Sequence, residues 1–319
     1  MNVVPLIRAS ASLAPIAIAM VFLVTGVNRP WAQDALFESR QMTPGEYTGG
    51  IEGPAFGPDG NLYVVNFQDS GTIGKLKPGA EQSELFAKLP AGSIGNGIRF
   101  DGEGRMYVAD YKLHNVFVFE PGQDSPQVYF HSDSLNQPND LAIARDGTLY
   151  LSDPDFKGGT GQIWRVTRGP DGKGSGEVLL SERKLGVTNG IDLGPDDETL
   201  YVGESNTREV WSYRPVGSKL TEPRLINKFD SSDLDGLRTD IDGNIFVTRP
   251  GNGTVAMLAP DGTLVREIAT LGKKPSNLTF GGPGGKTIFV TQVDGGYVES
   301  FRVSRPGREP CLEASDLGC

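Results

Sequence analysis

A phrase of about 44 residues recurs six times along this chain of 319 residues. Each copy opens with a polar residue and a short apolar segment, passes through a polar turn, and then reaches an apolar residue followed by an aromatic one. The aromatic positions lie 43 to 51 residues apart and are Tyr63, Tyr107, Tyr150, Tyr201, Phe246 and Phe289. A repeat of this length indicates that the chain uses one small structural unit six times.

The segments between the turns are short and typical of strands. Pairs such as Asp59-Gly60 and Asp146-Gly147 separate apolar runs, and Asp-Gly in this setting indicates a β-hairpin. Repeats of similar length that are built from helix pairs are disfavoured by the 43 Gly and 22 Pro of the chain. The sequence therefore predicts an all-β fold, a six-bladed β-propeller with four-stranded antiparallel blades around a central channel.

The chain divides into one large domain with short flanking segments. Residues 1–32 contain Arg8 followed by an uncharged apolar run, which predicts a signal peptide, with an N-terminal anchor as the alternative. Residues 33–305 form the predicted propeller, and residues 306–319 form a tail. In an exported protein, Cys311 and Cys319 of this tail can form a disulfide; two free thiols are the alternative. The predicted location is periplasmic or secreted.

Charge and closure limit the partners of the chain. The formal net charge is −10, and no basic stripe interrupts the acidic surface, which argues against nucleic acid and anionic membranes as partners. Membrane contact is expected only through the possible N-terminal anchor. Because a closed propeller leaves no long sheet edge to cover, we expect a monomer.

The residue that opens each repeat carries the functional prediction. In a propeller the first strand of each blade lines the channel, so equivalent positions on these strands form a ring. The six opening residues are Glu52, Asn96, Asn139, Asn189, Asp235 and Ser276. Carboxylate and amide oxygens suit Ca²⁺, with Mg²⁺, Mn²⁺ or Zn²⁺ as substitutes. The alternative interpretation is that Asn and Asp before Gly are ordinary turn residues.

Four phrases in this set resemble the calcium-site motifs of the gluconolactonase, or regucalcin-like, family of six-bladed propellers. They are Ile51-Glu52-Gly53-Pro54, Gln137-Pro138-Asn139-Asp140, Thr188-Asn189-Gly190-Ile191-Asp192 and Leu234-Asp235-Gly236. The resemblance spans about residues 45 to 303. It implies that Glu52, Asn189 and Asp235 hold the metal, with Asn139 on it or beside it. Asp140 and Asn96 would support these ligands from behind.

The resemblance also implies a reaction, the hydrolysis of a lactone by a calcium-activated water molecule. Asp235 would be the base or nucleophile, or a metal ligand only, and Asn139 and Gln137 would contact the substrate. Gln137 stands where family members that act on free sugar lactones often carry Arg, so this departure leaves the kind of lactone open. Two alternatives are an organophosphate or other ester hydrolase on the same metal site, and a non-enzymatic binding propeller that calcium stabilises.

Other features of the sequence are less informative about function. The histidine pair of the related paraoxonases has no evident counterpart in this chain, since His114 and His131 lie in or beside strand-like segments. We expect the substrate to be selected by Gly-rich loops at the rim, at residues 157–161, 168–176 and 248–253.

Overall fold

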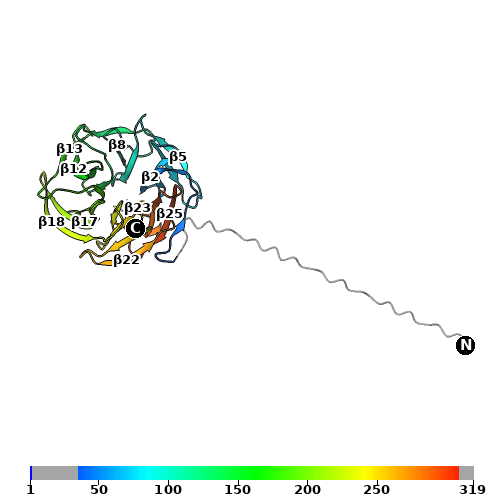
Figure 1. The fold of residues 1–319 in the computed structure, drawn as a ribbon. Helices are drawn as coiled ribbons and strands as arrows, with labels where there is room; N and C mark the ends of the chain where they lie inside the picture. The colour runs from blue at the N-terminus through cyan, green and yellow to red at the C-terminus, as the bar shows by residue number, and fades with distance from the viewer. Residues whose placement is uncertain (2–34, 309–319) are drawn as a thin grey trace.

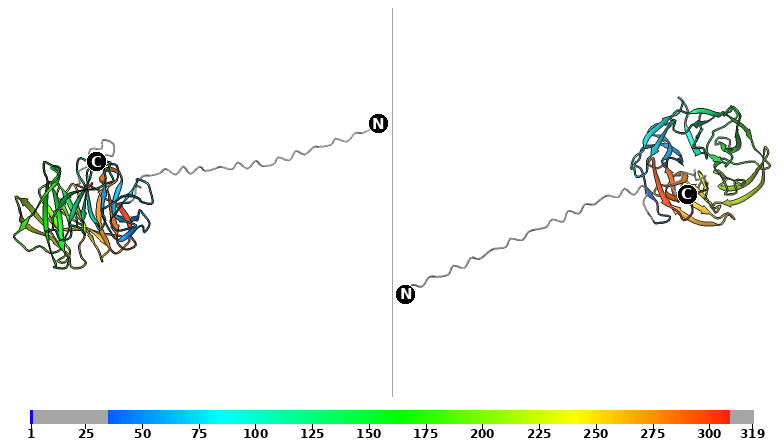
Figure 2. Two further views of the ribbon diagram at one scale, coloured as in Figure 1. Left: turned by 90° about the horizontal axis from the view of Figure 1, so that it is seen from above. Right: turned by 180° about the vertical axis from the view of Figure 1, so that it is seen from behind.

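The computed structural model describes residue 1 and residues 35–308, which form six small antiparallel sheets around a central axis (Figure 1). Seen from the side, the strands run roughly along this axis (Figure 2). The predicted six-bladed β-propeller is therefore confirmed. Nearly all of the predicted signal peptide, together with Cys311 and Cys319, falls outside the described residues, so export and the disulfide stay predictions.

The first three blades each contain four strands, and each blade runs outward from the channel in chain order. Blade 1 contains β2 (Tyr47–Phe56), β3 (Leu62–Phe67), β4 (Thr72–Leu76) and β5 (Glu84–Lys88). Blade 2 contains β6 (Gly95–Phe100), β7 (Met106–Asp110), β8 (Asn115–Phe119) and β9 (Gln127–His131). Blade 3 contains β10 (Leu141–Ile143), β11 (Leu149–Asp155), β12 (Thr160–Arg168) and β13 (Gly174–Val178).

The last three blades depart from this pattern at two places. Blade 4 contains β15 (Thr188–Leu193), β16 (Leu200–Glu204), β17 (Glu209–Val216) and β18 (Lys219–Lys228), with the short β14 (Leu180–Ser181) added in parallel to β18. Blade 5 contains β19 (Leu237–Thr239), β20 (Ile245–Arg249), β21 (Thr254–Leu258) and β22 (Leu264–Ala269). Blade 6 contains β23 (Pro275–Gly281), β24 (Thr287–Gln292), β25 (Tyr297–Arg302) and β1 (Arg40–Gln41).

The ring is closed by strand β1, which comes from the N-terminal side of blade 1 but belongs to blade 6. It pairs antiparallel with β25, with Arg40 opposite Ser300 and Gln41 opposite Glu299. The first and last blades are therefore joined by backbone hydrogen bonds as well as by packing. Opening the ring requires that these bonds break, so the closure stabilises the whole propeller.

The core lies between neighbouring blades, where apolar side chains of facing sheets pack together. In the cluster between blades 1 and 2, Val65 and Ile73 of blade 1 pack with Ile98, Val108 and Phe117 of blade 2. The described residues contain no α-helix, and a single 3-10 turn, η1 (Pro283–Gly285), connects β23 to β24. Among the described residues, no helix is long and apolar enough to cross a membrane.

The predicted Asp-Gly turns connect the first and second strands of the blades. Gly60 and Gly147 adopt φ angles of 77° and 84°, which side chains with a Cβ rarely adopt. These turns lie at the end of the channel opposite to the residues that open the repeats, because the inner strand of each blade runs from one end to the other. The two ends of the propeller are thus built from different parts of the repeat.

Candidate functional site

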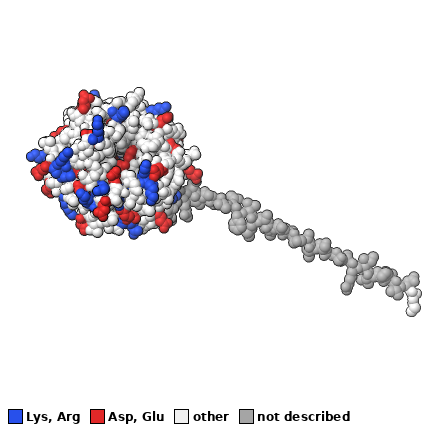
Figure 3. Space-filling model, in the orientation of Figure 1, with Lys and Arg blue, Asp and Glu red and all other residues white. Residues whose placement is uncertain are grey.

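Five of the six residues that open the repeats line one hollow at the axis of the propeller. They are Glu52, Asn96, Asn139, Asn189 and Asp235, and the hollow has a volume of about 420 Å³. The hollow is visible in Figure 3, with acidic side chains beside it. The sixth residue, Ser276, is buried, and its hydroxyl donates a hydrogen bond to the carbonyl oxygen of Ile51 at 2.8 Å. The predicted ring therefore exists, with five of its members facing the hollow.

The glycines that follow three ring residues bring neighbouring blades together. The amide of Gly97 donates to the carbonyl of Asn139 at 2.8 Å, and the amide of Gly190 donates to the carbonyl of Asp235 at 3.0 Å. A Cβ on Gly190 would lie 2.4 Å from that carbonyl oxygen, so no larger residue fits without displacement. Residues Asn96-Gly97 and Asn189-Gly190 lie within inner strands rather than in hairpin turns, which removes the turn interpretation for them.

The two carboxylates of the ring disfavour each other's ionisation. Burial raises the pKa of Glu52 to about 7, although the hydrogen bond from Asn277 pulls it down. Burial also raises the pKa of Asp235 well above its ordinary range, and the charge of Glu52 raises it further. A cation between such carboxylates would favour the ionised form of both.

Two amide oxygens of the ring have no hydrogen-bond donor. Among the described residues, nothing donates to the buried Oδ1 atoms of Asn96 and Asn189. The amide nitrogen of Asn189 donates to the hydroxyl of Ser205 at 3.1 Å, which orients the amide. Buried oxygens without donors are costly in a protein interior unless another positive group meets them. The oxygen atoms of the ring therefore suit a metal ion that prefers oxygen ligands, such as Ca²⁺.

The amides are needed as much as the acids in such a site. Among the described residues, no group of three or more His, Cys, Asp or Glu is arranged to hold a metal ion. A cation in the hollow would thus be bound by Glu52 and Asp235 together with amide oxygens. This composition disfavours metals that require nitrogen or sulfur ligands.

A charged network lies directly behind the ring. Asp140 accepts hydrogen bonds from Arg99 and from Arg238, each at 2.9 Å. Burial raises the pKa of Asp140 to about 6, while Arg99 opposes the rise. Asn277 donates to Glu52 Oε2 at 3.0 Å and to Asp140 Oδ2 at 3.4 Å, so it connects the ring to the network. The charge of the buried Asp192 also raises the pKa of Asp140, so this layer contains both acids and guanidinium groups.

The remaining predicted residues take different positions. Asn96 lines the hollow itself, whereas Asp140 lies behind the ring. Gln137 is not among the described residues that line the hollow. Its side-chain nitrogen donates to the hydroxyl of Tyr111 at 2.7 Å, and its oxygen accepts from the amide of Phe156 at 3.3 Å. Gln137 therefore holds two residues that line the hollow.

Further residues that line the hollow lie outside the ring. Tyr111, Phe156, Asp233 and Pro250 line the hollow and come from segments that connect strands. Pro250 belongs to the predicted rim loop 248–253 and Phe156 directly precedes the predicted loop 157–161, whereas Tyr111 and Asp233 had no indication in the sequence. His114 and His131 do not line the hollow.

One predicted rim loop lies at the wrong end of the molecule. Arg168 lies beside Asp101 and Asp146, which belong to the turns between first and second strands. The segment 168–176 connects the outer strands β12 and β13 at that end, so it cannot select a substrate in the hollow. The error arose because composition alone does not tell which end of a strand a loop follows.

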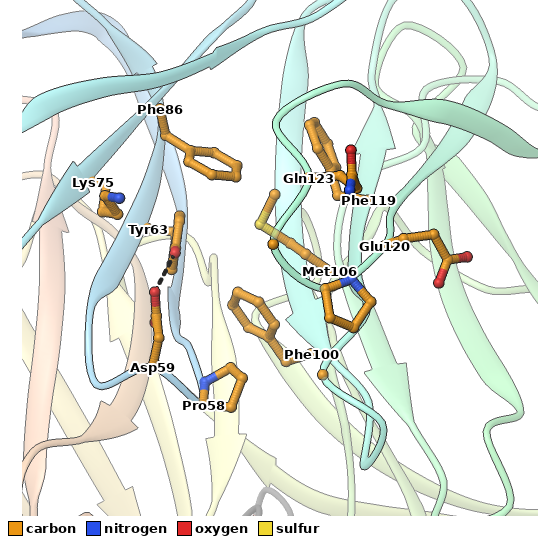
Figure 4. Close-up of a pocket in the computed structure, with 13 residues that line it drawn as sticks. Pro58, Asp59, Tyr63, Lys75, Phe86, Phe100, Met106, Phe119, Glu120 and Gln123 are labelled. Carbon is orange, nitrogen blue, oxygen red and sulfur yellow. Dashed lines mark hydrogen bonds between the residues drawn. The ribbon is translucent and has the colours of Figure 1, made fainter.

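A second hollow, of about 360 Å³, lies between blades 1 and 2 (Figure 4). Aromatic rings form much of its wall, among them Tyr63, Phe86 and Phe100. The hydroxyl of Tyr63 donates to Asp59 at 2.7 Å, as Figure 4 shows. No residue of the predicted site lines this crevice, so the axial hollow remains the candidate site.

Residues 51–294 match the family described as SMP-30/Gluconolactonase/LRE-like region. The chain belongs to this family. The predicted membership in the gluconolactonase and regucalcin-like propellers is thereby confirmed, and the matched residues include every ring position from Glu52 to Ser276.

Individual relatives of this SMP-30/gluconolactonase family member agree with the assignment. A gluconolactonase from Zymomonas mobilis is 27% identical over 277 residues, which cover 75% of this chain and 75% of the relative. A diisopropyl-fluorophosphatase from Loligo vulgaris is 25% identical over 295 residues, covering 84% and 94% of the two chains. The crystal structure of regucalcin from Agrobacterium tumefaciens, described as a calcium-binding protein, has a TM-score of 0.70 at 19% identity and covers 87% and 96%. At 19% identity, the similarity to this structure shows a shared fold and nothing further.

Proposed function

We propose that this protein is a lactone hydrolase that depends on a divalent cation, with Ca²⁺ as the first candidate and Mg²⁺, Mn²⁺ or Zn²⁺ as substitutes. The observation that carries the proposal is the convergence of Glu52, Asn189 and Asp235 on one open hollow, with the Asn189 oxygen lacking a donor among the described residues. The names of the relatives, a gluconolactonase among them, support the same reaction class.

Glu52, Asn189 and Asp235 would hold the cation, with Asn139 as a further oxygen ligand. The chemistry supplied by a bound divalent cation is Lewis acidity, which polarises a carbonyl and makes a water molecule more acidic. The hollow leaves room for a substrate beside these ligands, which a catalytic site requires and a purely structural site does not. This openness favours an enzyme over a binding propeller.

The residues of the chain would then have separate tasks. Asp235 accepts a proton from a water molecule while the water oxygen forms a bond to the lactone carbonyl carbon. The ring C–O bond breaks, the proton passes to the released oxygen, and the product is a hydroxy acid. Asn139 lies where its amide can donate to a substrate oxygen. If Asp235 is a ligand only, another group must take the proton, and Asp233 also lines the hollow.

The same site could act on a phosphorus ester or fluoride instead of a lactone. This alternative is favoured by the diisopropyl-fluorophosphatase relative, of which the alignment covers 94%. The two functions share the ligands and differ in the electrophile, so one set of proteins can test both.

The test is proton release from a panel of lactones, with fluoride release from diisopropyl fluorophosphate in parallel. Chelated protein is assayed with and without added Ca²⁺, together with Glu52→Gln and Asp235→Asn. The matched controls are Glu81→Gln and Asp124→Asn, which change exposed acids away from the hollow. We expect lactone turnover that Ca²⁺ restores and that only the first two substitutions abolish. Turnover that survives chelation, or fluoride release without lactone turnover, would contradict the proposal.

A further inference from the structure

Part of the wall of the hollow outside the ring is apolar. Ile94, Tyr111, Phe156, Leu234 and Pro250 all line it, and they come from the connecting segments of blades 2, 3 and 5. Phe156 stays 44% exposed, although large apolar side chains are usually buried. An exposed ring beside a concave site can lose its contact with water when an apolar group of a ligand packs on it.

Two polar side chains that line the hollow outside the ring, Asn66 and Ser205, are already engaged. The amide nitrogen of Asn66 donates to the carbonyl of Gly50 at 2.6 Å, and its oxygen accepts from the amide of Gly71 at 3.1 Å. The hydroxyl of Ser205 donates to the carbonyl of Leu234 at 2.5 Å. A substrate with many hydroxyl groups would give up its bonds to water there and find few new partners.

The charge of the hollow also restricts the substrate. None of the described residues that line it is Lys, Arg or His, whereas Glu52, Asp233 and Asp235 are carboxylates. A phosphate or carboxylate on the substrate would therefore meet no cationic side chain and would be repelled by Asp233 at the exposed mouth.

We propose that the natural substrate is an uncharged lactone that carries an alkyl or aryl substituent, and that Tyr111 and Phe156 form the wall that selects it. The inference rests on the proposed function, since it names the substrate class of the same site. Gln137 is the positioning residue for this wall, because its side chain bonds both the hydroxyl of Tyr111 and the amide of Phe156.

The first measurement compares kcat/KM for three six-membered lactones on the calcium-loaded protein: δ-nonalactone, δ-valerolactone and glucono-δ-lactone. We expect kcat/KM for δ-nonalactone to exceed kcat/KM for glucono-δ-lactone by about tenfold or more, because even one methylene group changes kcat/KM by about that factor in an apolar pocket. Phe156→Ser should lower the ratio of kcat/KM for δ-nonalactone to kcat/KM for δ-valerolactone by about tenfold. The control is Leu85→Ser, which removes an apolar side chain of similar exposure, 49%, from the outer strand β5.

The second measurement follows binding without turnover. Calorimetry compares the lactam analogues of δ-nonalactone and of glucono-δ-lactone on the same proteins. If the protein prefers the lactam of glucono-δ-lactone in binding, or glucono-δ-lactone itself in turnover, this inference is wrong, and the proposed lactone hydrolase function is unaffected. Tight binding of the alkyl lactam that Phe156→Ser weakens, without turnover of any lactone, supports the apolar wall and refutes the proposed function. If neither lactam binds and no lactone is hydrolysed, both proposals are wrong.

Discussion

Glu52 and Asp235 are placed where each makes the ionisation of the other unfavourable. Burial is the larger cause for both, and it raises the pKa of Glu52 from an ordinary value of 4.5 to about 7. A carboxyl group whose pKa is raised on folding stabilises the fold less as the pH rises from the lower value through the higher one. The metal-free protein therefore carries the penalty of ionising Glu52 above about pH 7, and the ionisation of Asp235, whose pKa is also raised, adds to it.

We expect Glu52→Gln to separate this penalty from cation binding. At pH 8 the metal-free variant should melt at a higher temperature than the metal-free wild type, and the difference should shrink as the pH falls toward 5, where Glu52 of the folded protein is protonated. Added Ca²⁺ should raise the melting temperature of the wild type, because a ligand stabilises the state that binds it, and should leave the variant unchanged. Differential scanning calorimetry measures both effects.

The control for this experiment is Glu81→Gln, which should keep the calcium response of the wild type. A calcium-dependent rise of equal size in Glu52→Gln would show that Glu52 is not a ligand. A lower melting temperature of that variant without metal would show that its charge does not oppose folding.

The site residues that recur in each repeat could be predicted from the sequence, whereas those that occur in only one blade could not. Asn189 and Asp235 could be predicted because equivalent positions occur in every blade and because their phrases resemble a known site. Tyr111 and Asp233 lie in connecting segments, where nothing in one sequence tells which side chains turn toward the axis. The buried network of Arg99 and Arg238 was equally invisible, because its members meet only after the blades have closed.

The inner strands are the elements that give the site its geometry. Five ring residues lie on these strands or just before them and line the hollow. The glycine that follows Asn189 lets its strand bond directly to the backbone of Asp235 in the next blade. The distance between the two side chains thus depends on a backbone contact. The repeat explains the short strands and the Asp-Gly turns. It does not predict β14, which adds a fifth strand to blade 4, or β1, which completes blade 6 from the other end of the chain.

We expect Gly190→Ala to disturb both the fold and the site. The added Cβ would lie 2.4 Å from the carbonyl oxygen of Asp235, and forcing an atom into such a packed contact costs about 1–3 kcal/mol. The backbone of Asp235 must move, so Ca²⁺ affinity should fall as well. Gly102→Ala is the matched control, because a Cβ there would have no atom within 4 Å. Urea unfolding and calcium titration of both variants test this, and equal behaviour would refute it.

In the whole molecule, both ends of the described chain hold the ring together. Strand β1 joins blade 6 to the start of the chain, and the segment after β25 crosses the turn end of the channel. The amide of Arg308 donates to the carbonyl of Thr239 at 2.9 Å, and its guanidinium donates to the carbonyls of Gly194 at 2.9 Å and Ile143 at 3.0 Å. These contacts join blades 3, 4 and 5 at the end of the propeller opposite to the site.

The contribution of this segment can be measured with two arginines that differ in burial. Arg308 is only 6% exposed and also pairs with Asp192 and Asp197, whereas Arg305 pairs with Asp242 on the surface. Removing one partner of a buried ion pair costs about 3–5 kcal/mol, while an exposed pair contributes about 0–1 kcal/mol. In urea unfolding we therefore expect Arg308→Met to lose several times more stability than Arg305→Met. Equal losses would mean that the segment merely rests on the propeller, whereas the predicted difference would make it a structural part of the ring.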